Sequence, residues 1–251
     1  MQSLGRIRWR EVCPGNAVRR TTVGAILPAL IAGVLAAAPG PTAERGGGQE
    51  TGTIAGRVTV TNAPEPRMVE VTADQQVCGD EVEDRAVVVD GSGGLANAVI
   101  LVAGVPWGDA RPEPVIDNAG CHFVPRVQVA PTRSVLKVRS ADDVLHTTHA
   151  YDDRHRTLFN IAIPFPGLEI ERPLRRPGPV RVECDSHGWM RGWIYVTDDV
   201  GTVTGAGGRY ELTGIPPGTY DLTVWHERYD SVTRQVTVTA GGTAAASFTL
   251  D

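Results

Sequence analysis

Three residues late in the chain could together bind a metal ion. Cys184, His187 and Met190 follow one another at intervals of three residues, in the run Cys-Asp-Ser-His-Gly-Trp-Met. A thiolate and imidazoles with a weak thioether ligand suit copper in a trigonal site of two histidines and one cysteine, where the metal exchanges single electrons. Tetrahedral zinc rarely takes methionine, and hard cations prefer carboxylates. The spacing therefore predicts a copper site that still lacks one imidazole.

The missing imidazole has two candidate sources upstream. His146 and His149 lie in the run Leu-His-Thr-Thr-His-Ala. In a strand, residues three apart face opposite sides, so the two histidines do not both point at one metal ion. This periodicity leaves open which of the two is the ligand.

The N-terminal residues 1–43 have the features of a secretory signal peptide. Arginines precede a 16-residue apolar stretch at 23–38, and a small-residue region follows it. The stretch is short for a membrane span of about 20 residues. We expect export to the periplasm or the extracellular space, with a membrane anchor if the signal stays uncleaved. The Arg19-Arg20 pair leaves general secretory and twin-arginine export both open.

The cysteine count depends on this cleavage. Loss of Cys13 leaves three cysteines, an odd number for an oxidising compartment in which free thiols tend to pair. Cys184 could be a buried structural thiol or could form a disulfide with Cys78 or Cys121. We predict a disulfide between Cys78 and Cys121, because both lie where a loop meets a strand, and this pairing leaves Cys184 free as a thiolate ligand.

The elements that must position these residues are short strands. After a flexible linker at 44–51, β-rich runs alternate with Gly, Pro, Asn and Asp, which predicts an all-β fold of sandwiches or barrels. Val180, Val182 and Cys184 share one face of a strand, so the thiol points to the core and the next residues form a loop at the strand end. Strands are expected at 53–60, 86–90, 97–103, 123–129, 134–139, 144–150, 179–184, 192–197, 208–212, 218–226, 232–239 and 244–250.

The C-terminal part, 200–251, contains Gly-Arg-Tyr at 208–210 and Pro-Pro-Gly-Thr-Tyr at 216–220. These motifs match the signature of the carboxypeptidase regulatory-like family, a small prealbumin-like β-sandwich, which this part therefore resembles. Runs within the N-terminal β segment, 52–114, look like the family's first two strands. The resemblance implies that this segment is the first part of a sandwich that the middle of the chain splits.

The middle of the chain, 115–199, contains Phe-Val-Pro followed by alternating valines at 123–129, the histidine run at 146–149, and the run from Cys184 to Gly192. With these motifs in this order it resembles the cupredoxin family, its amicyanin and plastocyanin members in particular. It implies a Greek-key β-sandwich that holds one type 1 copper ion.

The same resemblance assigns a role to each candidate ligand. It implies that His146 is the upstream imidazole, Cys184 the thiolate, His187 the second imidazole and Met190 the axial ligand. Thr147 stands where the family commonly has Asn, whose hydrogen bonds tie the two ligand loops together. A change at such a position tunes a metal site, so we expect an altered potential.

This ligand set predicts a type 1 copper protein that carries single electrons between redox protein partners. We expect no enzyme activity and no small-molecule substrate, because copper oxidases and nitrite reductases need a second copper cluster, typically built from His-x-His pairs, and the six histidines contain none. His187, on a loop expected to be exposed, would be the electron exit. The alternative is a non-redox module that binds a glycan or protein and carries a vestigial copper loop.

The charge balance restricts the partners further. The 24 Lys and Arg and 29 Asp and Glu are spread along the chain, which argues against nucleic-acid binding. Residues 1–43 carry five arginines and one glutamate, so their removal changes the net charge from −5 to −9. An acidic mature chain favours a basic redox partner, and without a membrane span it is limited to peripheral association with membranes.

Overall fold

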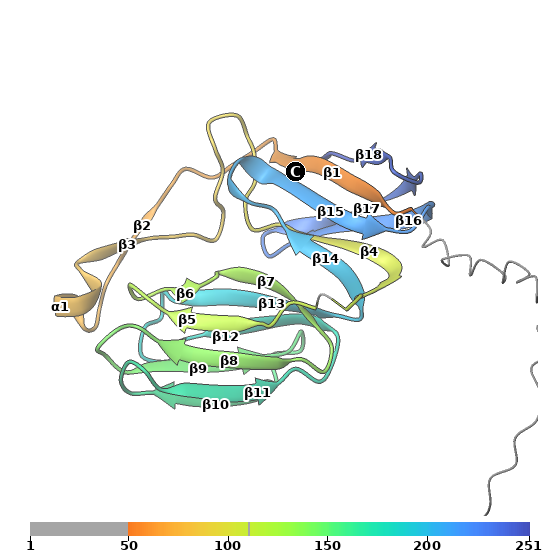
Figure 1. Cartoon of the computed structure of the whole chain (residues 1–251). Helices are drawn as coiled ribbons and strands as arrows, with labels where there is room; N and C mark the ends of the chain where they lie inside the picture. The colour runs from red at the N-terminus through yellow and green to blue at the C-terminus, as the bar shows by residue number, and fades with distance from the viewer. Residues whose placement is uncertain (1–49, 110) are drawn as a thin grey trace, which may run out of the picture. The chain divides into compact units, whose positions relative to one another are not determined.

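The computed structural model describes residues 50–109 and 111–251 (Figure 1). The predicted signal peptide at 1–43, with Cys13, and the first six residues of the linker lie outside this range. Within it, no helix has the length and apolar character needed to cross a membrane. Nearly all the regular structure is β, so the prediction of an all-β fold is confirmed.

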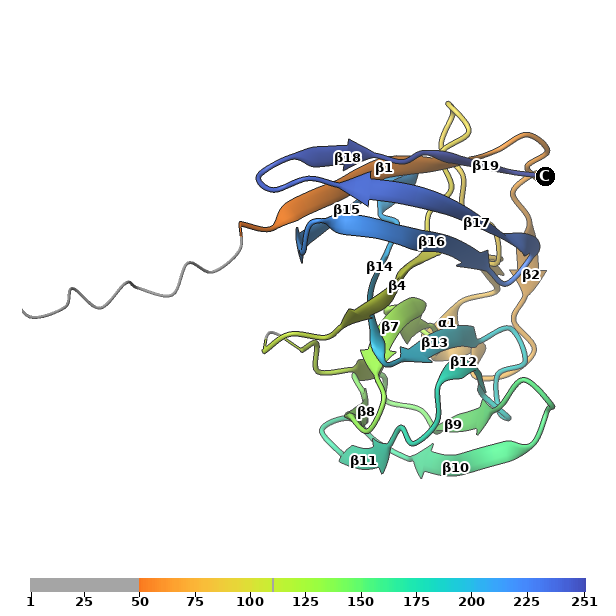
Figure 2. The same cartoon turned by 90° about the vertical axis from the view of Figure 1, so that its right-hand side faces the viewer.

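The strands form two sandwiches, seen one above the other in Figures 1 and 2. The middle sandwich contains β5 (Val115–Asn118), β6 (Phe123–Val124), β7 (Val127–Pro131), β8 (Val135–Ser140), β9 (His146–Tyr151), β10 (Thr157–Ile163), β11 (Glu169–Pro173), β12 (Gly178–Glu183) and β13 (Arg191–Thr197). The second, the outer sandwich, contains β1 (Gly52–Val60), β4 (Val99–Pro106), β14 (Asp199–Val203), the short 3₁₀ helix η1 (Ala206–Gly208), β15 (Arg209–Ile215), β16 (Gly218–His226), β17 (Tyr229–Val238), β18 (Thr243–Ala245) and β19 (Phe248–Leu250).

The middle sandwich packs a five-stranded sheet, β10-β9-β12-β13-β7, on a four-stranded sheet, β11-β8-β5-β6. Alternate side chains of each strand enter the space between the sheets, as in the buried-intermediate alternation of β9 and β12. This core contains Ile116, Leu136, Ile163, Val182 and Ile194. Because β9 and β12 are neighbours in one sheet, their ends bring distant parts of the sequence together.

The outer sandwich uses strands from both ends of the chain. β1 pairs antiparallel with β15 and parallel with β18 and β19, while β4 lies between β14 and β16. The chain therefore leaves this sandwich after β4, forms the middle sandwich, and returns at β14. The first strand is tightly covered: a Cβ on Gly56 would lie 1.7 Å from the Ala246 carbonyl oxygen.

The two sandwiches contact each other through an aromatic cluster. The Trp225 ring lies with its centroid 5.3 Å from that of Trp193 and 5.4 Å from that of Tyr195, edge to face in both pairs. Val99 and Val127 are buried beside these rings. Edge-to-face pairs add to the free energy of apolar burial, so this cluster helps to hold the sandwiches together.

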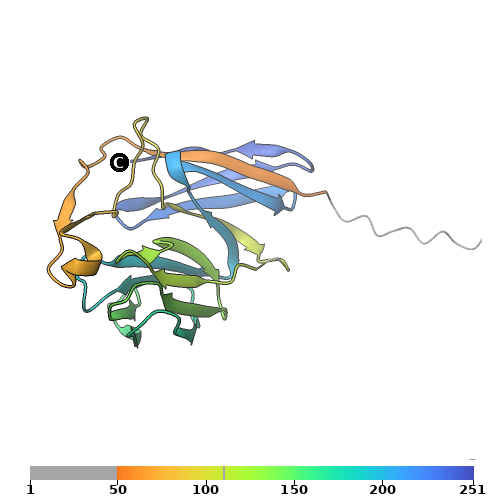
Figure 3. The ribbon, with the colours of Figure 1, turned by 60° about the vertical axis from the view of Figure 1, so that its left-hand side comes forward.

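A further segment belongs to neither sandwich. Between β1 and β4, the chain forms the hairpin of β2 (Met68–Glu70) and β3 (Glu81–Glu83), with the single-turn helix α1 (Gln75–Cys78) at its tip. Figure 3 shows this segment extending down one side of the molecule, from the outer sandwich to the middle one. The predicted strand at 86–90 is wrong, since the structure has there only an isolated bridge between Val89 and Leu95.

Candidate metal centre

The cysteine lies directly after a strand whose alternate residues are buried. Val180 and Val182 face the core of β12, and Cys184 continues that face with 3% of its surface exposed. The chain then turns tightly, because the Met190 amide donates to the His187 carbonyl (2.9 Å) and the Cys184 amide donates to the Met190 carbonyl (3.3 Å). This turn brings the histidine back over the thiol.

The upstream histidine comes from the neighbouring strand. His146 is the first residue of β9 and is fully buried, whereas His149 lies on the opposite face. There the His149 ring stacks on Tyr151, and its Nδ1 lies 2.9 Å from an oxygen of Asp185. The structure thus places His146, and not His149, beside Cys184.

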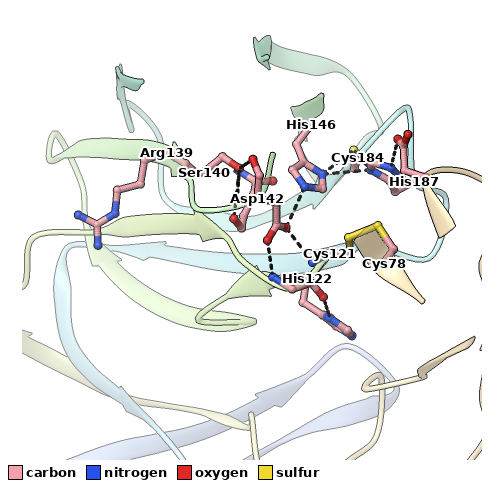
Figure 4. A network of polar contacts seen from close by, with 12 residues as sticks. Cys78, Cys121, His122, Arg139, Ser140, Asp142, His146, Cys184 and His187 are labelled. Carbon is pink, nitrogen blue, oxygen red and sulfur yellow. Dashed lines mark hydrogen bonds and ion pairs between the residues drawn. A yellow bond between two sulfur atoms is a disulfide. The ribbon is translucent and has the colours of Figure 1, made fainter. Parts of the chain in front are cut away.

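Three donor atoms meet in the core at the end of the middle sandwich (Figure 4). The Nδ1 atoms of His146 and His187 are 3.0 Å apart, and they lie 3.9 and 3.5 Å from Cys184 Sγ. Metal–nitrogen bonds of about 2.0–2.1 Å and metal–sulfur bonds of about 2.3 Å are typical of such ligands. One ion can therefore contact all three atoms, and the residues fit a soft-ligand metal such as copper.

Met190 is the fourth residue that the sequence indicates as a ligand. It is 2% exposed and belongs to the same core as Cys184. Its backbone hydrogen bonds to Cys184 and His187 close the ligand turn. The thioether is thus carried by the turn that also carries the thiol and one imidazole.

Two carboxylates that were not predicted from the sequence contact the imidazoles at Nε2, the ring nitrogen that faces away from the sulfur. The Nε2 atom of His146 lies 3.0 Å from Asp142 Oδ2, and the Nε2 atom of His187 lies 3.0 Å from Asp74 Oδ2. A proton on each Nε2 leaves the Nδ1 lone pairs free to face the sulfur. The carboxylates therefore select the tautomer that a metal requires. Asp142 precedes His146 by four residues, but Asp74 is more than a hundred residues from His187 and gives no local signal.

Electrostatics at His146 also favour a neutral imidazole. Burial lowers the pKa of His146, and the neighbouring His187 adds to this effect, while hydrogen bonding to Asp142 opposes it. A neutral ring is the form that coordinates a metal.

The thiol has its own hydrogen-bond donors, both from Thr147. The Thr147 amide donates to Cys184 Sγ at 3.3 Å, and the hydroxyl lies 3.8 Å from the same atom. The hydroxyl also accepts a hydrogen bond from the Asp185 amide at 2.6 Å. Thr147 thus ties the two ligand segments together. Hydrogen bonding around the cysteine sulfur tunes the potential of a type 1 site.

Cys78 and Cys121 form a disulfide, so Cys184 is the one free cysteine in the part of the chain that the structure describes. Cys121 is also linked to the centre, because its amide donates to Asp142 Oδ2 at 2.8 Å. The Trp189 indole donates to the Cys121 carbonyl, and its ring lies against that of His187 with centroids 5.0 Å apart.

The expected exposure of His187 is wrong. The His187 side chain is fully buried, because Asp74 covers its Nε2 edge and Trp189 lies against its ring. A strand-end loop is normally exposed, but here the hairpin from outside the sandwich lies over it.

Comparison with known proteins gives two results. Residues 194–251 match the model of the carboxypeptidase regulatory-like domain, which confirms the sequence-based assignment of this part. No curated protein matches the chain in sequence.

Solved structures that align with part of the chain include cupredoxins and a copper enzyme. A purple cupredoxin from Nitrosopumilus maritimus is 18% identical, with 34% of this chain and 99% of that one aligned at a TM-score of 0.31. The P52G mutant of amicyanin is 14% identical over 39% of this chain and 98% of its own, with a TM-score of 0.30. A copper-containing nitrite reductase from Thermus scotoductus SA-01 is 19% identical over 38% of this chain and 26% of its own, with a TM-score of 0.30.

Proposed function

We propose that the protein is an exported type 1 copper protein that carries single electrons between redox protein partners. One observation carries the proposal: two imidazole nitrogens and a thiol sulfur lie within 3.9 Å of one another in a water-excluding core. Copper held by such ligands exchanges one electron between its Cu(I) and Cu(II) states.

Each residue has a defined part in holding the ion. His146 and His187 would bind through Nδ1, Cys184 through its thiolate sulfur, and Met190 would be the weak axial ligand. Asp142 and Asp74 orient the imidazoles through Nε2, as outer carboxylates do in other metal sites. Because these ligands are fixed by packing and hydrogen bonds before the ion arrives, the site can keep nearly one geometry in both oxidation states.

The remaining features support an extracytoplasmic carrier. A disulfide between distant cysteines is typical of proteins from oxidising compartments. The acidic charge of the mature chain favours a basic partner protein, and the encounter rate should fall as salt is added. The carboxypeptidase regulatory-like domain would then be an accessory module beside the copper-binding part.

Copper titration of the mature protein tests the proposal. We expect Cu(II) to produce an intense blue colour from thiolate-to-copper charge transfer, which ascorbate bleaches and a mild oxidant restores. Cys184→Ser should abolish the colour. His149→Ala is the matched control, because His149 lies on the opposite face of the strand that carries His146, and it should stay blue. A colourless mature protein that binds no copper at neutral pH would refute the proposal.

A further inference from the structure

The hairpin outside the two sandwiches lies on the candidate metal centre. Residues 68–83, here called the lid segment, contain β2, α1 and β3 and pair mainly with each other. Figures 1 and 3 both place α1 beside the end of the middle sandwich. The lid segment has little core of its own: Val71 and Val82 are its buried hydrophobic residues. Its position therefore depends on a few specific contacts.

The first of these contacts is the carboxylate of Asp74. This residue is the N-cap of α1, and its backbone carbonyl accepts the amides of Val77 and Cys78. Asp is a strong N-cap because its side chain can accept a hydrogen bond from a backbone amide of the first helical turn. The Asp74 side chain makes no such hydrogen bond. It points to His187 instead, at 3.0 Å from Nε2. The Asp74 backbone has a φ of 54°, in the left-handed region that residues other than glycine rarely adopt.

The second contact is covalent. Cys78, four residues after Asp74, is joined to Cys121 of the middle sandwich. The Cys121 amide donates to Asp142, which holds His146. One disulfide thus anchors both carboxylates that orient the two imidazoles.

We propose that the lid segment closes the metal centre, with Asp74 as a positioning residue for His187 and the Cys78–Cys121 disulfide as its anchor. The inference extends the proposed copper function to the control of access. The closed centre excludes external ligands and water from the imidazole edge that a strand-end loop would otherwise expose, and it slows release of the metal. Direct contact between a partner and His187 is blocked, because the ring is fully buried.

Chemical modification of the metal-free mature protein tests the lid without copper. Diethyl pyrocarbonate acylates accessible histidines, and mass spectrometry of peptides gives the rate at each site. In the wild type we expect His187 to react far more slowly than the exposed His155, the internal reference. Asp74→Ala should raise the rate at His187 severalfold, and Cys78→Ala/Cys121→Ala should change it in the same direction. Asp74→Asn retains an acceptor oxygen and should keep His187 protected.

The matched control is Asp80→Ala, which removes an exposed carboxylate of the same hairpin. It should leave the His187 rate unchanged. Near-ultraviolet circular dichroism of every variant shows whether it is folded, so that unfolding is not read as lid opening. Two results would refute the proposal that the lid segment closes the centre. One is a wild-type His187 that reacts as fast as His155; the other is a folded Asp74→Ala variant in which His187 reacts as slowly as in the wild type.

Copper release gives a second readout if the protein binds copper. Transfer of copper to an excess of chelator should be about tenfold faster for Asp74→Ala than for the wild type, since loss of an outer partner of a ligating histidine weakens binding by about 10–100-fold. Equal release rates would also contradict the lid. If the protein binds no copper but His187 is protected from modification, the proposed function is refuted, whereas the proposal that the lid segment covers His187 is supported.

Discussion

Asp142 orients one imidazole of the proposed copper centre, and its replacement by alanine tests whether that orientation matters. The carboxylate accepts hydrogen bonds from His146 Nε2 (3.0 Å), the Cys121 amide (2.8 Å) and the Gly120 amide (2.7 Å). In Asp142→Ala, the imidazole can rotate or take the wrong tautomer. We expect copper affinity to fall by about 10–100-fold, or about 1.4–2.7 kcal/mol.

The same substitution should also destabilise the metal-free protein. His146 and Cys121 are both buried, so each would keep a donor without an acceptor. An unsatisfied buried donor costs about 1–3 kcal/mol, which gives about 2–6 kcal/mol for the two. The Gly120 amide is exposed and can bond to water, so it adds little.

Two assays separate these effects. Competition against a chelator of known affinity measures copper binding, and urea denaturation of the metal-free protein measures the free energy of unfolding. Asp143→Ala is the matched control, because Asp143 is the exposed neighbour of Asp142. If Asp142→Ala and Asp143→Ala have the same copper affinity and stability, then Asp142 does not orient His146 and our interpretation of the hydrogen bonds is wrong.

Three further predictions concern stability, each measured by urea denaturation. Cys78→Ala/Cys121→Ala should cost about 4 kcal/mol, because the disulfide closes a loop with a sequence separation of 43 residues; a loss below about 1 kcal/mol would contradict this. Burial lowers the pKa of His226 to about 4, so stability should fall by about 3 kcal/mol from pH 6.5 to pH 4 as the unfolded chain takes up the proton first; His226→Leu should flatten this pH dependence, and an unchanged slope would refute the assignment. Gly56→Ala should cost at least about 1–3 kcal/mol, because the new Cβ would collide with the Ala246 carbonyl, and a neutral effect would show that β1 can shift.

Local sequence patterns were sufficient for much of the fold. Strands with regular alternation of burial, such as β9 and β16, lie close to where the period of two predicts them. The edge strands β10 and β11 were missed, because most of their side chains are exposed or half-buried and lack a clear apolar alternation. The hairpin of β2 and β3 gives no signal in the sequence for a different reason, because strands of only three residues each are too short to show an alternation.

The ligand turn follows from the amino-acid sequence alone. Cys184, His187 and Met190 are close in sequence, so a single tight turn brings them together, and the alternation of a strand separates His146 from His149. These are short-range consequences of backbone geometry. The types of these side chains were enough to indicate copper.

The enclosure of the centre, by contrast, depends on how distant elements pack in the folded chain. Asp74 meets His187 because the hairpin between β1 and β4, which belongs to neither sandwich, reaches the middle one and is held there by the Cys78–Cys121 disulfide. No local pattern encodes a contact between residues that lie so far apart in the chain, because it depends on how whole elements pack. For this reason the sequence predicted an exposed His187, whereas packing of the lid segment buries it.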